Sequence, residues 1–184
     1  EAFVPLIKGK AFSHPRELPQ VLARVRGHPM AKAALEGALW DLYGRIEGKP
    51  LAALLGGVRD EVTAGVSIGI QTEVSALLDR IAGFVDQGYQ RVKLKVKPGW
   101  DLEVLEAVRA RFPDLTLSVD ANCAYTLNDV DRLKGFDRFG LMMIEQPLWH
   151  EDLVGHARLA EDLSTPLCLD ESITSPHRAW EALE

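Results

Sequence analysis

The sequence predicts an α/β fold in which parallel strands alternate with helices. Three observations lead to this prediction. The first 60 residues read as helical, the remainder alternates between short apolar strand-like runs and longer runs with helical spacing, and charged residues recur at a constant interval at the ends of the strand-like runs. Alternating strands and helices imply parallel strands joined by right-handed crossovers, which fits both a doubly wound sheet and a (β/α)8 barrel.

The N-terminal 60 residues contain one long expected helix. Apolar residues recur at helical spacing over Pro29–Glu47, and Gly48 is placed to end the helix. A second, short helix is expected over Pro50–Leu55. Trp40 and Tyr43 lie within the long helix, and core packing is the simpler interpretation of both aromatic side chains.

From residue 62 onward the pattern changes to strands and helices in alternation. The expected strands are Val62–Ile68, Arg91–Val96, Leu115–Asp120, Leu141–Glu145 and Leu167–Asp170. The expected helices are Glu73–Gln87, Asp101–Phe112, Leu127–Lys134 and Glu151–Leu163, with another beginning near Ser175. The expected caps of the first three are Thr72, Asp101, and Thr126 with Asp129 as a capping box.

The composition excludes several classes of function. The 184 residues carry a net charge of −6 and no basic stripe, which argues against a nucleic-acid surface. No apolar run approaches the roughly 20 residues that span a membrane. Cys123 and Cys168 lack metal-type spacing, so a reducing cytoplasm is the expected location. The histidines also lack ligand spacing and are expected on the surface or in packing: His14, His28, His150, His156 and His177.

A constant interval separates four charged residues at the expected strand ends. Lys95 to Asp120, Asp120 to Glu145, and Glu145 to Asp170 are each 25 residues apart. The carboxyl ends of the strands are where an α/β barrel builds its active site. Side-chain alternation along each strand places these charged residues on the face opposite the apolar residues that pack under the helices.

The three acidic residues together predict a metal site. One acidic residue after a strand is usually a cap or turn former, and Lys93 alone would more often be a solvated strand charge. Three clustered carboxylates, however, repel one another and need a cation or shared protons. Asp120, Glu145 and Asp170 would offer oxygen ligands that suit Mg²⁺, with Mn²⁺ or another divalent ion as alternatives.

Four short motifs at the strand ends resemble those of the enolase superfamily, in its muconate-lactonizing subgroup. They are Lys93-Leu94-Lys95, Val119-Asp120-Ala121-Asn122, Ile144-Glu145-Gln146-Pro147 and Leu169-Asp170-Glu171-Ser172. Two further stretches are similar to the o-succinylbenzoate synthase and N-acylamino acid racemase family: Pro98-Gly99-Trp100-Asp101 and Ala124-Tyr125-Thr126-Leu127-Asn128. The resemblance extends over nearly the whole chain.

The resemblance implies an incomplete (β/α)8 barrel. Residues 61–184 would form its first five strands, and residues 1–60 the helical end of an α+β capping domain. Continuing the 25-residue interval from Asp170 places the next strand end near position 195, beyond Glu184. Together with a start at Glu1 that lacks an initiator methionine, this leads us to expect a chain truncated at both ends.

The resemblance also assigns roles to individual residues. The metal ligands would be Asp120, Glu145 and Asp170, and Lys95 would be a catalytic acid/base with Lys93 beside it as a supporting charge. The remaining expected positions, at the active site or beside the ligands and in contact with substrate, are Asn122, Glu171 and Ser67.

The implied reaction removes the proton α to a carboxylate. A lysine base takes the proton and a divalent metal stabilises the resulting enediolate. The amine must be partly neutral, and a neighbouring ammonium such as Lys93 with partial desolvation is expected to lower the pKa of Lys95. Dehydration would give o-succinylbenzoate, a menaquinone precursor, while reprotonation from the opposite face would racemise an N-acylamino acid. The resemblance leaves both outcomes open.

Two alternatives from other classes stay open at this point. A metal-independent aldolase could use Lys95 to form a Schiff base, although three carboxylates would then lack a partner. A barrel fragment could also serve as a non-catalytic binding module. For the enzyme, the expected partners are a small-molecule carboxylate substrate and further copies of the chain in a homo-oligomer, with no nucleic acid or membrane.

Overall fold

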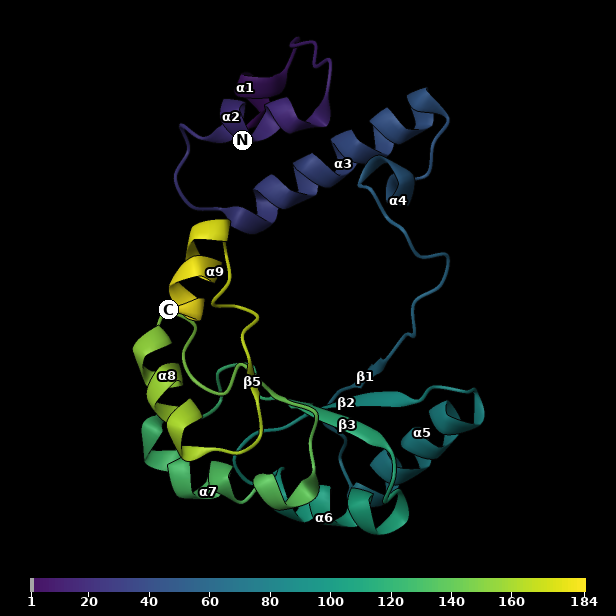
Figure 1. Ribbon diagram of the computed structural model, residues 1–184, viewed down its shortest axis with the longest axis vertical. Coiled ribbons are helices and arrows are strands. Elements are labelled where there is room, and N and C mark those ends of the chain that lie inside the picture. Colours follow the sequence, from purple (N-terminus) through teal and green to yellow (C-terminus); the bar gives the residue numbers. More distant parts are fainter. Residues whose placement is uncertain (1) are drawn as a thin grey trace. The chain divides into compact units, whose positions relative to one another are not determined.

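The computed structural model describes residues 2–184 and divides the chain into two units (Figure 1). The first unit ends at Val62 and the second begins at Thr63. The predicted boundary, between residues 60 and 61, lies two positions earlier. No helix within residues 2–184 combines the length and the apolar character that crossing a membrane requires.

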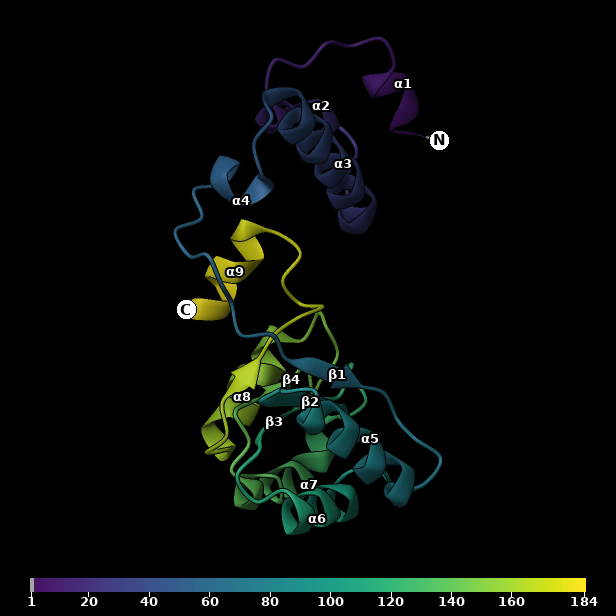
Figure 2. The same cartoon turned by 90° about the vertical axis from the view of Figure 1, so that its right-hand side faces the viewer.

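The described part of the first unit is helical, as the sequence predicts. Its elements are α1 (Val4–Ile7), η1 (Pro15–Glu17), α2 (Leu18–Leu22), α3 (Pro29–Glu47) and α4 (Leu51–Leu54). The predicted bounds of the long helix are confirmed, and Gly48 ends it in the left-handed conformation with φ +64°. Helix α2 packs along α3 (Figure 2).

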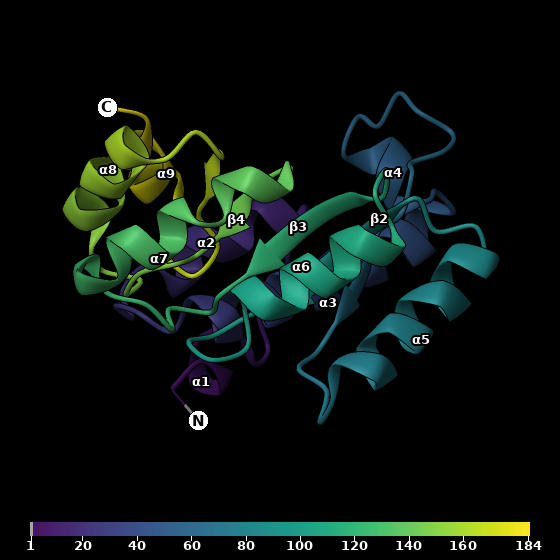
Figure 3. The ribbon, with the colours of Figure 1, turned by 90° about the horizontal axis from the view of Figure 1, so that it is seen from below.

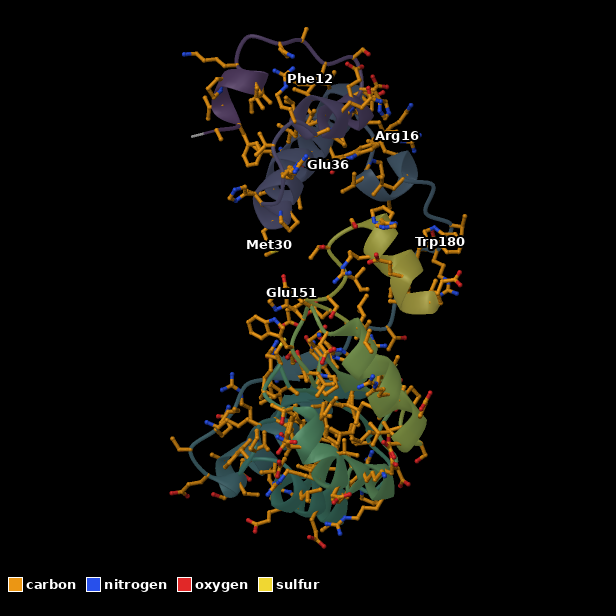
Figure 4. The ribbon with its side chains drawn as sticks, turned by 90° about the vertical axis from the view of Figure 1, so that its left-hand side faces the viewer. Phe12, Arg16, Met30, Glu36, Glu151 and Trp180 are labelled. Atoms are coloured by element: carbon orange, nitrogen blue, oxygen red, sulfur yellow. The ribbon has the colours of Figure 1, made fainter. Side chains whose placement is uncertain are left out.

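Aromatic packing fixes the interior of this first unit. Trp40 is buried, and the His14 ring lies edge-on to it at 5.2 Å between ring centroids. Tyr43 contacts the same histidine ring from the next turn of α3, at 5.0 Å. The prediction that Trp40 is a core residue is therefore confirmed. By contrast, Met30 at the start of α3 is 85% exposed and points away from the helix (Figure 4).

The second unit contains one parallel sheet. Its strands are β1 (Val66–Ile68), β2 (Arg91–Lys95), β3 (Thr116–Asp120), β4 (Ile144–Glu145) and β5 (Leu167–Cys168). The spatial order is β1-β2-β3-β4-β5, so each strand pairs with its neighbour in the chain. A doubly wound sheet reverses its strand order at a switch point, and no reversal occurs among these five strands.

The helices of the second unit follow the strands in alternation. They are α5 (Val74–Asp86), α6 (Leu102–Arg111), η2 (Leu127–Asp129), α7 (Val130–Lys134), η3 (Asp137–Phe139), α8 (Leu153–Asp162) and α9 (Pro176–Leu183). Figure 3 shows α5, α6 and α7 on the same side of the strands. Right-handed crossovers that all advance in one direction place every helix on one face of a sheet.

Strand alternation separates the core from the polar face, as predicted. In β2, Val92 and Leu94 are buried against the helices, whereas Lys93 and Lys95 lie on the opposite face. The apolar residues of β3 and the inward residues of α5 and α6 complete this core: Leu117, Val119, Leu77, Ile81, Leu105 and Val108. Helices α5, α6 and α7 therefore cover the apolar face, and the charged face lies on the other side of the sheet.

Several element ends differ from the predictions. Strand β1 begins at Val66 rather than Val62, whose side chain is 80% exposed and therefore has no core to join. Asp101 caps α6 as predicted, accepting a hydrogen bond from the Leu102 backbone. The capping box of Thr126 and Asp129 is also confirmed. The prediction that Thr72 caps α5 is wrong, because the chain stays extended through Glu73.

The Asp137 carboxylate joins the segment after α7 to the segment that enters β5. One oxygen accepts a hydrogen bond from the Ser164 backbone at 2.9 Å, and the other accepts from the Thr165 backbone at 2.8 Å. Burial alone would raise the pKa of Asp137, but these hydrogen bonds outweigh it and hold the pKa below its ordinary value.

Replacement of Asp137 by alanine is expected to destabilise the protein in a pH-dependent way. A lowered folded-state pKa gives stability that is present above the unfolded pKa and is lost as pH falls through the folded pKa. We expect the free energy of unfolding to fall by about 1–2 kcal/mol at pH 7, a figure that allows for the partial exposure of Asp137. The difference should be smaller near pH 3. Urea unfolding at several pH values measures this, with Asp86→Ala on the surface of α5 as control. An equal difference at all pH values would contradict it.

Candidate active site

The sheet register aligns polar residues from neighbouring strands at the carboxyl edge. Lys95 pairs with Asp120, Asp120 with Glu145, and Glu145 with Cys168. These residues therefore form one row across β2, β3, β4 and β5. Because residues in a row project from the same face, side chains that are 25 positions apart in the sequence become neighbours.

Lys93 lies between the two carboxylates of this row. Its amine is 2.7 Å from Glu145 Oε1 and 3.1 Å from Asp120 Oδ2. Both carboxylate side chains are nearly buried, with 1% of Asp120 and 8% of Glu145 exposed. Two buried negative charges this close need a cation, and the Lys93 ammonium supplies one.

The pKa values in this group follow from the same contacts. Burial would lower the pKa of Lys93, but its hydrogen bonds to Glu145 and Asp120 outweigh burial and raise it. Burial would raise the pKa of Asp120, but hydrogen bonds from Lys95 and Lys93 and from the Asn122 backbone hold it below its ordinary value. Lys93 is therefore held as an ammonium, and its role as a supporting charge beside the base stays a prediction.

Lys95 is held by two acceptors. Its amine donates to Asp120 Oδ2 at 2.6 Å and to Asn122 Oδ1. The Asn122 amide in turn donates from Nδ2 to Glu171 Oε1 at 2.9 Å, and the Asn122 backbone N–H donates to Asp120 Oδ1. The structure thus brings four residues that the sequence analysis singled out into one hydrogen-bonded group.

Asp170 lies beyond the row that contains the other two acidic residues. The register places Cys168 opposite Glu145, and Asp170 follows two residues later on an exposed part of the chain. Within residues 2–184, no three acidic, histidine or cysteine side chains are grouped closely enough to hold a metal ion. The constant 25-residue interval is not matched by the β4–β5 pairing, which offsets the strands by 23 residues. The role of Asp170 as third ligand stays a prediction.

All three acidic residues nevertheless act on the same thiol. Burial raises the pKa of Cys168, and the negative charge of Glu145 raises it further. Asp170 and Asp120 act on it in the same direction, against the positive charge of Lys93. Asp170 is therefore close enough to Cys168 for its charge to raise the pKa of this thiol.

Ser67 is one level further inside the sheet than the row at the edge. It pairs with Lys93, which pairs with Ser118. These three residues and Glu145 line a hollow of about 260 Å³ on the polar face of the sheet. A contact between Ser67 and substrate stays a prediction.

Gln146 is a residue of the site whose role the sequence analysis missed. It is fully buried, has φ +41°, and its side-chain oxygen accepts hydrogen bonds from the backbone N–H groups of Asp170 (2.8 Å) and Ser172 (3.2 Å). Its Nε2 donates to Ser172 Oγ at 2.8 Å and to Leu148 O at 3.2 Å. Gln146 thus joins the loop after β4 to the loop after β5. Its position directly after Glu145 was the available signal.

His156 supports the same loop. It is buried, as the packing alternative allowed, and its Nε2 accepts a hydrogen bond from the Leu148 backbone at 3.2 Å. Its Nδ1 lies 2.7 Å from the carbonyl oxygen of Asp152, so Nδ1 carries the proton. The histidine therefore fixes the loop that follows β4 onto α8.

The family comparison identifies both parts of the chain. The family model "Mandelate racemase / muconate lactonizing enzyme, N-terminal domain" matches residues 1–56. The family model "Enolase C-terminal domain-like" matches residues 76–184. The two matches are separated by residues 57–75, and the division between the structural units, at residues 62 and 63, lies within this stretch.

Curated relatives that are 43–56% identical to this chain carry two kinds of name. An o-succinylbenzoate synthase of Geobacillus kaustophilus is 56% identical over 100% of this chain and 49% of its own length. An N-succinylamino acid racemase of Thermus thermophilus is 50% identical over 100% of this chain and 50% of its own length. A solved structure of an enolase superfamily member from Enterococcus faecalis, 43% identical, aligns with a TM-score of 0.88 over 100% of this chain and 50% of its own.

The chain therefore spans about half the length of the relatives that it matches. The resemblance inferred from the strand-end motifs is confirmed by the two family matches and by these identities. The fold, the motif positions and the comparisons agree: this chain belongs to the enolase superfamily, within the mandelate racemase / muconate lactonizing enzyme family.

Proposed function

We propose that this chain provides a divalent-metal site and one lysine base of an enzyme that abstracts the proton α to a carboxylate. The observation that carries the proposal is the row at the carboxyl edge of the sheet. In this row the Lys95 amine is bonded to Asp120 and Asn122, beside two buried carboxylates that share one cation. The substrate would be a small-molecule carboxylate, as the names of the relatives suggest.

The five strands would be the first five of a (β/α)8 barrel, preceded by the helical part of a capping domain. The strand order without reversal and the position of α5, α6 and α7 on one side of the sheet support this assignment. In such a barrel the polar face of the sheet becomes the interior, and the row at its carboxyl edge becomes the floor of the active site.

Two of the residues present, Asp120 and Glu145, have the oxygen donors and the convergence that a hard divalent ion requires. Asp120 and Glu145 already direct oxygen atoms at a single cationic group, the Lys93 amine. Asp170, two residues after the end of β5, would add a third oxygen donor, and such an all-oxygen set suits Mg²⁺ or Mn²⁺. When bound, the ion would stabilise negative charge on the substrate carboxylate as the proton leaves.

Lys95 is suited to remove the proton. A neutral amine has two N–H bonds and one lone pair, and here two acceptors are in place for the N–H bonds: Asp120 Oδ2 and Asn122 Oδ1. The lone pair is then free to face the substrate α-carbon. Lys93 would remain an ammonium that balances the buried carboxylates.

Two products follow from one proton abstraction. Loss of a hydroxyl from the carbanion would give o-succinylbenzoate, and reprotonation on the opposite face would racemise an N-acylamino acid. The relatives at 56% and 50% identity carry one name each, so both activities are proposed for the full-length protein.

Chelation of divalent metal tests the proposal. Full-length protein is assayed in parallel with the cyclohexadiene precursor of o-succinylbenzoate and with N-succinylamino acids, and kcat/KM values are compared. We expect EDTA to lower either activity by at least about 10³-fold and Mg²⁺ to restore it. Activity that survives EDTA, together with borohydride trapping of a carbonyl substrate on Lys95, would instead support the Schiff-base aldolase.

A further inference from the structure

We infer that Glu171 is a positioning residue that orients the Lys95 amine through the side chain of Asn122. The inference rests on the proposed function, in which Lys95 is the base. Its basis is a relay of two successive hydrogen bonds: Lys95 Nζ donates to Asn122 Oδ1, and Asn122 Nδ2 donates to Glu171 Oε1 at 2.9 Å.

The chemistry of the two end groups fixes the orientation of the amide between them. An asparagine side chain has a donor end and an acceptor end of nearly the same shape. The Glu171 carboxylate can only accept, so it requires the NH₂ end of Asn122. The oxygen of Asn122 must then face Lys95, where it accepts an N–H of the amine.

The reversed amide would act against proton abstraction. If the NH₂ group of Asn122 faced Lys95, it would donate to the lone pair of the amine, which is the electron pair that must take the substrate proton. A hydrogen bond to the neutral amine's lone pair would compete directly with the reaction. Glu171 prevents this without touching Lys95 itself.

The backbone holds both ends of this relay in place. Asn122 and Cys123 have consecutive left-handed conformations, with φ +42° and +63°, which turn the chain after β3. The Cys123 N–H donates to the Gln146 carbonyl at 2.8 Å. On the other side, the neighbours of Glu171 in the sequence are both held by the Gln146 side chain. Asn122 and Glu171 are thus fixed relative to each other through one residue.

The second oxygen of Glu171 indicates that this residue does not serve to stabilise the fold. Glu171 Oε2 is buried and has no hydrogen-bond partner among the residues that the structure describes. A buried acceptor without a partner is unfavourable for folding. A carboxylate that costs stability at one oxygen and aligns a base through the other has the character of a functional residue.

The test uses Glu171→Gln in the full-length protein with Mg²⁺ and a pair of N-succinylamino acid enantiomers. Glutamine is nearly the same shape but can donate as well as accept, so Asn122 loses its fixed orientation. We expect kcat for α-proton exchange in D₂O to fall roughly 10- to 100-fold for the enantiomer whose exchange Lys95→Ala abolishes, with KM little changed. The other enantiomer should change by less than about 3-fold, because a different base would serve its face.

Two further measurements separate positioning from structure. Mn²⁺ affinity, measured without substrate, should be unchanged in Glu171→Gln. In a double-mutant cycle, Glu171→Gln should add nothing in an Asn122→Leu background, because the relay is already broken. Glu151→Gln, on the exposed surface before α8 (Figure 4), is the matched control and should behave as wild type.

Each remaining outcome overturns the inference. Equal loss for both enantiomers, weaker Mn²⁺ binding, or full additivity of the two substitutions would show that Glu171 supports the site as a whole. Retained exchange of the Lys95-dependent enantiomer would show that Asn122 needs no such partner. Wild-type protein that exchanges neither enantiomer would overturn the inference, and if it also failed to convert the cyclohexadiene precursor, the proposed function itself would be refuted.

Discussion

Asp120→Asn is expected to lower α-proton exchange in the full-length protein by at least about 10³-fold. Asp120 contacts more of the site than any other carboxylate described above. One oxygen receives hydrogen bonds from the Lys93 and Lys95 amines, and the other receives the Asn122 backbone N–H. Asparagine keeps the shape but removes a charge that is almost fully buried.

The loss has two physical sources. Without the Asp120 charge, the Lys93 ammonium would keep only Glu145 as a negatively charged partner. A divalent ion would lose one of its proposed oxygen ligands. The same substitution leaves Lys95 without a charged acceptor. Asp170→Asn is expected to act in the same direction through the metal site alone, and Glu145→Gln through the metal site and through its contact with Lys93.

Two measurements together test this prediction: α-proton exchange in D₂O and Mn²⁺ affinity by titration. The three variants should bind Mn²⁺ at least about 10-fold more weakly, while Asp79→Asn on the surface of α5 should not. Normal exchange in all three variants would defeat the proposed metal site. Loss of exchange with unchanged Mn²⁺ affinity in all three would show that the carboxylates act on the lysines rather than on a metal.

Lys95→Ala is expected to abolish exchange of one substrate enantiomer, a loss of at least about 10³-fold, and to leave exchange of the other within about 10-fold. The reason is geometric, since one amine can reach only one face of the α-carbon. Alanine removes the amine without adding charge, although the Asp120 carboxylate then keeps only Lys93 as a charged partner.

The matched control is Lys97→Ala, an exposed lysine two residues further along the same segment. Exchange followed by NMR in D₂O, with each enantiomer assayed separately, gives the ratio directly. Equal retention of both enantiomers would remove Lys95 from the role of base. Equal loss of both would indicate that alanine disrupts the charged group rather than one face of the reaction.

The sequence predicted the elements that depend on local chemistry and periodicity. The long helix Pro29–Glu47, the helix cap Asp101 and the two-residue alternation in β2 follow from side-chain spacing and capping alone, and all three are present. The pairing of Lys95 with Asp120 also agrees with the 25-residue interval that separates these strand ends, because successive crossover units of equal length bring their strand ends into register.

What the sequence did not predict depends on pairing between strands and on buried polar contacts. The interval that ends at Asp170 looks the same as the others, yet β5 pairs with β4 through Cys168, two residues earlier. Gln146 was not assigned a role because a glutamine after a strand has many possible uses. Only the fold shows that its oxygen faces two backbone N–H groups from a loop more than 20 positions away.

The attachment of two loops to the single Gln146 amide has a consequence for attempts to redesign substrate preference. The turn that carries Asn122 and the turn that carries Glu171 cannot be reshaped independently, because the backbone and side chain of one residue hold both. Libraries that vary one turn should therefore vary the other in the same clone. Substitutions that make more room for substrate at one of these turns are expected to disturb the other turn as well.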